Sequence, residues 1–180
     1  MAADFSFPSV GVSSINMRLV SATSVSSSPF TFNQQVYEHQ GVRWEAEVSF
    51  PPMSHNDAKA MAGFLAGLRG QSKTFTFGNP LHNTTAAGFI TGSVGATSVT
   101  ANFAGAAVGD HFQHGDYLYI ITSQSGSNYG IMPPLRTSAA TSTVDFTYPV
   151  GKWRLASNEV NWSINEASIY GFTLAIVEAL

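Results

Sequence analysis

The chain has 180 residues, enough for one domain of ordinary size or a domain carrying a small insert, and its 44% hydrophobic and 12% aromatic content excludes an intrinsically disordered chain. Its formal net charge is −3 with no basic run, which argues against a nucleic-acid binder, and the absence of cysteine excludes disulfides, thiolate metal sites and cysteine nucleophiles. Only 11% of the residues are charged, against about 25% in soluble domains, a profile that indicates surfaces covered by neighbouring subunits but is shared by secreted all-β proteins.

Three β-strands are expected in the first fifty residues, over 15–23, 30–37 and 42–50. Three serines and Pro29 separate the first two strands, and Gly41 marks a turn before the third. The third strand has the clearest pattern, because apolar and polar residues alternate over nine positions. Its apolar face consists of Val42, Trp44, Ala46, Val48 and Phe50.

One α-helix is expected over residues 55–69. Pro51 and Pro52 end the preceding strand, Ser54 suits the N-cap, and Asp57 follows three residues later in a position like that of a capping box. Gly70 suits the left-handed residue that follows a helix. The helix has an apolar stripe that must pack against a sheet, made of Ala58, Met61, Ala62, Leu65 and Leu68, with Phe64 beside it.

The rest of the chain favours short strands. One is expected over 73–77, and the composition then turns to Ala, Gly, Thr and Ser between about residues 84 and 143. Strands are expected there over 88–90, 98–103, 117–122, 129–132 and 142–146, and after it over 153–156, 161–164 and 169–177. The fold class is therefore predicted to be mainly β, a β-sandwich with one packed α-helix that carries a small all-β insert.

Residues 110–116 form the densest group of potential metal ligands, with two histidines and two aspartates. A sharply bent loop could turn these four side chains toward one divalent cation. The favoured interpretation is a strand–turn–strand, because Gly109-Asp110 and Gly115-Asp116 are common turn dipeptides. No phosphate loop, nucleotide fingerprint, zinc spacing or nucleophile elbow accompanies the group.

The remaining candidates divide between core and surface. Trp44 belongs to an alternating apolar face and is expected in the core, whereas Trp153 and Trp162 could form a platform that stacks on sugars. Glu45 and Glu47 share a strand face with Arg43, which favours a solvated face or a subunit contact over an acid/base pair. No catalytic residue, cofactor site or metal site is assigned, and we expect the protein not to be an enzyme.

The N-terminus lacks the charged and apolar regions of a signal peptide, and no apolar stretch reaches the roughly 18–20 residues that span a bilayer. We therefore expect no membrane insertion and a protein that stays in the cytoplasm until it is released by other means than signal-dependent export.

Three segments of the chain stand out together: WEAEVSFPPM at 44–53; FLAGLRGQ at 64–71 with TFTFGNP at 74–80; and PPLR at 133–136 with WRLASNEVNW at 153–162. Together they resemble the distal tail proteins of long-tailed, siphovirus-type bacteriophages. The likeness covers residues 15–80 and 130–180 well and the insert loosely. The order strand, Pro-Pro, helix, Gly, strand is moderately specific, and the three segments in sequence are more so.

The resemblance implies a β-sandwich like that of tail-tube proteins, with one packed helix, that forms a hexameric adaptor ring between the tail tube and the tail-tip hub or baseplate. It implies a ring-forming belt domain over 1–85 and 148–180 and a small inserted β subdomain over 86–147. The implied partners are the chain itself as a homohexamer, the tail tube protein, the hub protein and, as a further candidate, the tape measure protein. The implied location is the virion tail, assembled in the host bacterial cytoplasm.

DNA would only pass through such a ring, since six copies at −3 each carry −18 and would not retain it. Larger members of the family carry carbohydrate-binding-like modules, and this insert is too small for one, which speaks against receptor binding.

Two alternatives remain open at this point. A carbohydrate-binding or adhesin module of the tail tip would use Trp153, Trp162 and the Thr/Ser-rich insert. A small hydrolase of the tail tip would use the group at residues 110–116, and would need metal held by His111 and His114.

Overall fold

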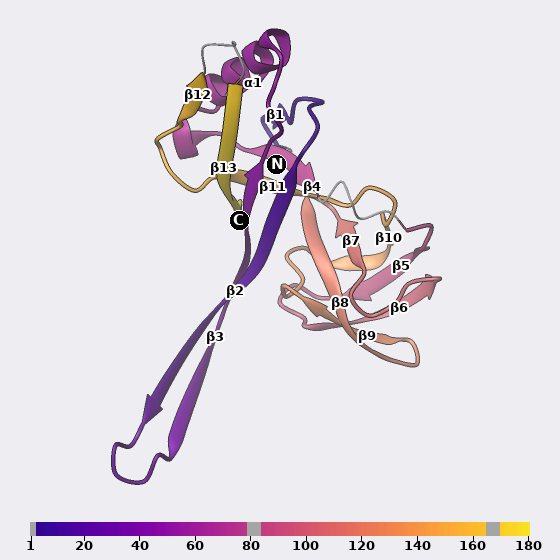
Figure 1. The fold of residues 1–180 in the computed structure, drawn as a ribbon. Helices are drawn as coiled ribbons and strands as arrows, with labels where there is room; N and C mark the ends of the chain where they lie inside the picture. The colour runs from indigo at the N-terminus through magenta and orange to yellow at the C-terminus, as the bar shows by residue number, and fades with distance from the viewer. Residues whose placement is uncertain (1–2, 79–83, 165–169) are drawn as a thin grey trace.

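The computed structural model describes residues 3–78, 84–164 and 170–180 of the chain. This part forms two β-sheets and one α-helix, so the predicted mainly β class with a single helix is confirmed (Figure 1). No helix among these residues is long and apolar enough to cross a membrane.

The larger sheet has seven strands in the order β1-β4-β11-β13-β3-β2, with β12 paired to one end of β13. It joins strands from both ends of the chain, because β13 pairs with β3 and β11 pairs with β4, both antiparallel. The strand bounds are β1 Phe5–Ser6, β2 Ser14–Ser27, β3 Gln34–Ser49, β4 Phe75–Gly78, β11 Val150–Leu155, β12 Trp162–Ile164 and β13 Tyr170–Glu178.

The helix α1 (His55–Leu68) ends one residue earlier than predicted, and a short 3-10 helix, Gly70–Ser72, follows it. The predicted N-cap is confirmed, since the Ser54 hydroxyl accepts a hydrogen bond from the Asp57 backbone N–H and donates one to the Asp57 carboxylate. The chain then leaves the helix through left-handed Arg69 and Gly70, with φ of 50° and 65°.

The helix packs its apolar stripe on one face of the seven-stranded sheet, as the sequence predicts. Ala58, Met61, Leu65 and Leu68 are almost fully buried there, whereas Ala62 is only half-buried. The sheet contributes alternate side chains of its central strands to the same core, among them Val48, Phe75, Leu155, Leu174 and Ile176. The opposite face of the sheet carries no helix in the described part of the chain, and most of its alternate residues are polar or small, among them Arg18, Arg43, Glu45, Glu47 and Lys152.

The second sheet has six strands in the order β10-β5-β6-β9-β8-β7 and its own apolar core. Its two edges meet, because Gln113 and Asp145 exchange backbone hydrogen bonds of 2.8 and 3.1 Å, so the sheet curls almost into a closed barrel. The bounds are β5 Ala87–Gly92, β6 Ser98–Ala104, β7 His111–His114, β8 Tyr117–Ser125, β9 Asn128–Met132 and β10 Ala139–Val144.

All the strands of the second sheet lie between residues 87 and 144, inside the predicted insert. The two sheets touch through β8, where Leu118 belongs to the core of the first sheet while Tyr119 and Ile121 belong to the core of the second. The predicted domain bounds, 1–85 with 148–180 and 86–147, stay a prediction.

The largest error of the sequence analysis concerns residues 30–50. We predicted two strands with a turn at Gly41, but β3 runs without a break from Gln34 to Ser49. Gly41 lies at a bulge, where the register between β2 and β3 shifts after the Ser21–Val42 pair, and a side chain on Gly41 would meet Ala22 at 3.3 Å. The glycine thus marks a close approach within a long hairpin and not its end.

Candidate assembly surface

The most unusual surface of the protein is the outer part of the β2–β3 hairpin, residues 22–41, here called the arm. Figure 1 shows the arm projecting away from both sheets. Its strands pair from Thr23–Glu38 through Val25–Val36 to Ser27–Gln34. Every residue of the arm is exposed except Ser28, which is half-buried in the tip. The arm therefore has no core of its own on either face.

The tip of the arm is a compact loop that holds two phenylalanines outward. Ser28 closes the loop, since its N–H donates to the Asn33 carbonyl and its carbonyl accepts from the Phe32 N–H, both at 2.9 Å. Phe32 has a φ of 56°, a left-handed conformation that a bulky residue rarely adopts. Phe30 is 92% and Phe32 79% exposed, and these two rings are here called the aromatic tip.

The arm exposes large apolar side chains among uncharged polar ones. Val25 and Val36 face each other across the strands at 57% and 59% exposure, and Tyr37 is 63% exposed on the other face. No charged residue occurs from residue 20 to residue 37. An exposed apolar patch without charge is typical of a surface that a partner covers.

The backbone of the arm and of β2 also lacks partners on one side. β2 is the terminal strand of its sheet, and within its 14 residues the only charged side chain is Arg18, with no proline or glycine. Edge strands of monomeric proteins are often protected by several charges, prolines or bulges, and β2 has only Arg18 and the bulge opposite Gly41. A two-stranded ribbon alone is also marginally stable in water. Both features indicate that another chain pairs with or packs against this hairpin.

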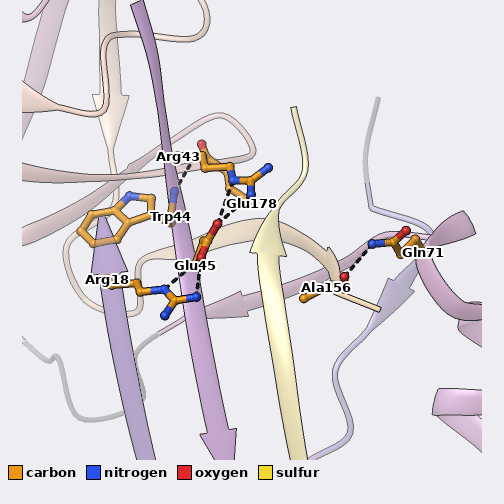
Figure 2. Close-up of polar contacts among 7 residues, drawn as sticks. All are labelled: Arg18, Arg43, Trp44, Glu45, Gln71, Ala156 and Glu178. Carbon is orange, nitrogen blue, oxygen red and sulfur yellow. Dashed lines mark hydrogen bonds and ion pairs between the residues drawn. The ribbon is translucent and has the colours of Figure 1, made fainter. Parts of the chain in front are cut away.

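The uncovered face of the seven-stranded sheet carries a small ionic network at the base of the arm (Figure 2). Glu45 accepts hydrogen bonds from Arg18 on β2, at 2.9 and 2.7 Å, and from Arg43 on its own strand, at 3.0 and 2.7 Å. Hydrogen bonds from Arg43 and then from Arg18 lower the pKa of the Glu45 carboxyl below its usual value. The network agrees with the predicted solvated or contact face.

A second polar group joins the two sheets. The buried carboxylate of Glu178 on β13 accepts from the Arg136 guanidinium at 3.0 and 3.3 Å and from the Trp44 backbone N–H at 3.0 Å, the latter drawn in Figure 2. The same guanidinium also donates to the Val42 carbonyl, and the Arg136 N–H donates to the Tyr119 hydroxyl. Burial raises the pKa of that Tyr119 hydroxyl to about 12. The group positions the six-stranded sheet beside the root of the hairpin.

The histidines and aspartates of residues 110–116 are spread apart. His111 and His114 lie three positions apart on β7 and so project to opposite faces of that strand. Burial lowers the pKa of His114, whose Nδ1 lies 3.3 Å from the Thr137 hydroxyl. The Asp110 carboxylate accepts a hydrogen bond from the Ala107 N–H. Within the described ranges no three His, Cys, Asp or Glu side chains gather closely enough to hold a metal. The strand and turn interpretation is confirmed, with β7 ending at His114 and β8 beginning at Tyr117.

The tryptophans give no sugar platform in the described part of the chain. Trp44 is 5% exposed and donates its indole N–H to the Leu118 carbonyl at 2.9 Å, as expected of a core residue. Trp153, which the sequence left open between core and sugar platform, is 1% exposed and donates its indole N–H to the Phe77 carbonyl at 2.7 Å, so it is a core residue. The side chain of Trp162 lies outside the described residues.

Comparison with known proteins finds no protein-family model that matches the chain and no curated protein that matches it.

The sequence analysis missed the arm as a functional element. It interpreted Phe30 and Phe32 as part of a strand, because they alternate with polar residues like the buried faces elsewhere. The available signal was the run of 18 uncharged residues from 20 to 37, long enough for a hairpin and without the charges that a solvent-exposed hairpin normally carries.

Proposed function

We propose that the protein is a non-enzymatic structural subunit that assembles with copies of itself into a closed ring, and that this ring is an adaptor in a phage tail. The observation that carries the proposal is the arm: a hairpin exposed on both faces, uncharged up to Tyr37, that presents apolar side chains at its tip and along its strands and projects from the edge of a sheet. Such an element gains stability only when a neighbour covers it, and a closed ring covers every copy of it.

The tail-adaptor part of the proposal depends on the three segments that resemble distal tail proteins. In that role the ring is a homohexamer located in the virion tail, between the tail tube protein and the tail-tip hub protein, with DNA passing through its channel. The low charge of the chain and the uncovered face of the seven-stranded sheet agree with a surface that neighbouring proteins occupy.

The proposal is tested by removing the arm. Residues 22–41 are replaced by Asn-Gly, which joins the Ser21–Val42 pair through a two-residue hairpin turn. Because the arm has no core, the variant should unfold at the same temperature as the natural chain at a concentration where both are monomers. Light scattering and negative-stain images should show rings for the natural chain, alone or with a tail tube protein, and monomers for the variant. Rings formed equally by both chains would contradict the proposal. So would a natural chain that stays monomeric both alone and with a tail tube protein.

A further inference from the structure

An apolar pocket lies at the opposite edge of the seven-stranded sheet from the arm. Its walls are the segment after β1 and the facing ends of β4 and β11, and its volume is about 260 Å³. Phe7 and Phe77 form an aromatic floor, with ring centroids 5.0 Å apart, and Tyr148 stands at the rim with 65% of its surface exposed. Val10 and Val150 complete the apolar lining.

We propose that the aromatic tip of one copy, Phe30 and Phe32, inserts into this pocket on the next copy. This proposal rests on the proposed self-assembly and identifies the contact that would join neighbouring copies. The occupant is a second copy because Figure 1 shows the arm running away from the β1–β4 edge, so a chain cannot fill its own pocket. In the sheet order β1-β4-β11-β13-β3-β2, the pocket lies at the β1–β4 edge and the arm extends from the β3–β2 edge.

Size and chemistry match between the two surfaces. A cavity of about 150 Å³ is enough to bind benzene, so the pocket of about 260 Å³ holds one phenylalanine ring of the tip, and the second ring packs at its open mouth. An entering ring meets Phe7 and Phe77, which suits edge-to-face packing. Neither the tip nor the pocket lining contains a charged residue. A larger hollow of about 490 Å³ beside the base of the arm suits the tip less well, because Glu38, His39 and Arg136 line it.

The contact is heterologous, since it joins two different surfaces of the same chain. Each copy then offers one arm and one pocket, and repetition of the contact continues from copy to copy until the rotation closes it into a ring. A closed ring leaves no arm and no pocket uncovered.

Cysteine cross-linking tests the contact directly, because the natural chain has no cysteine. One variant carries Thr31→Cys, between the two phenylalanines of the tip, and a second carries Tyr148→Cys at the rim of the pocket. Both positions are exposed, so neither substitution disturbs a core. Mixed and oxidised, the two variants should form a disulfide-linked heterodimer. Thr31→Cys mixed with Val108→Cys, an equally exposed position next to β7, is the matched control and should form none.

A second pair of variants measures what the tip contributes. Phe30→Ser with Phe32→Ser should raise the concentration needed for half-assembly by at least about tenfold, because both rings then lose their burial. Val25→Ser with Val36→Ser, on the shaft of the arm, should raise it less. The unfolding midpoint of either monomer should not change, since all four side chains are exposed.

The failures are distinguishable. Rings that form normally while the Thr31–Tyr148 pair does not cross-link above the control overturn the pocket contact and leave the proposed function standing. A natural chain that does not associate at all overturns both.

Discussion

At the residue scale, Glu178 connects the two sheets through a buried carboxylate. Its carboxylate is 3% exposed and binds the Arg136 side chain from the six-stranded sheet region and the Trp44 backbone N–H from β3. A buried charge without its partner is strongly unfavourable, whereas a complete pair is close to neutral relative to an apolar replacement. Glu178 therefore matters for stability because of what its removal leaves behind.

Glu178→Ala should lower the free energy of unfolding by about 3 kcal/mol, since it leaves the Arg136 guanidinium and the Trp44 N–H without their acceptor. Urea denaturation followed by tryptophan fluorescence measures the change. Glu47→Ala, on the exposed face of β3, is the control and should change it by less than about 0.5 kcal/mol. Equal effects of the two substitutions would show that the junction contributes nothing.

Glu45 predicts a pH-dependent effect of smaller size. Its pKa in the folded state lies below the usual value of 4.5, because Arg43 and Arg18 donate hydrogen bonds to it. The stabilisation is therefore complete above pH 4.5 and is lost as the pH falls through the lower pKa of the folded state. Glu45→Gln should cost less than about 1 kcal/mol at neutral pH, since both arginines are exposed, and nothing in strong acid. A cost that is the same at both pH values would refute this origin.

At the scale of elements, the sequence predicted best where the pattern is local. The Ser54 cap, the apolar stripe of α1 and the alternation of residues 42–50 each follow from neighbouring residues, and each is found in the structure. The continuity of β3 through Gly41 could not be predicted, because it depends on Ala22 lying opposite. The parallel pairing of β1 with β4 and the Arg136–Glu178 pair join residues far apart in the chain, and no local pattern reports them.

The cap of α1 predicts a stability effect at this scale. Ser54→Ala removes the hydroxyl that accepts from the Asp57 N–H, so the free energy of unfolding should fall by about 1 kcal/mol. Ser54→Asn keeps a capping oxygen, so its free energy of unfolding should differ from that of the natural chain by only about 0.3 kcal/mol. Thermal unfolding of the three chains checks the order. An alanine variant as stable as the natural chain would mean that the packing of Met61 and Leu65 alone holds the helix.

The arm shows why exposure is harder to predict than strand formation. Alternation identifies a strand with two different faces, but it does not say whether either face is covered. Residues 30–33 form the tip loop and not the expected strand, but Val36 lies on the same strand as Trp44 and Ala46 and is 59% exposed, whereas those two are buried. What separates them is distance from the helix and from the second sheet, a property of the whole fold.

At the scale of the whole molecule, two surfaces are incomplete in a single chain. The arm exposes uncharged apolar side chains on one side of the seven-stranded sheet, and the Phe7–Phe77 pocket is open on the other. A chain with 11% charged residues has little else to keep such surfaces apart in solution. We propose that copies of the chain associate, because association covers both the arm and the pocket.

Hydrogen–deuterium exchange of the arm amides tests that claim most directly. The natural chain is labelled at high concentration, with a tail tube protein if association requires one, and again after dilution to monomers. The amides of residues 22–41 should exchange slowly in the assembly and at least about tenfold faster in the monomer, while those of α1 stay equally protected in both. Fast exchange of the arm in the assembly, equal to that in the monomer, would show that copies associate without covering it.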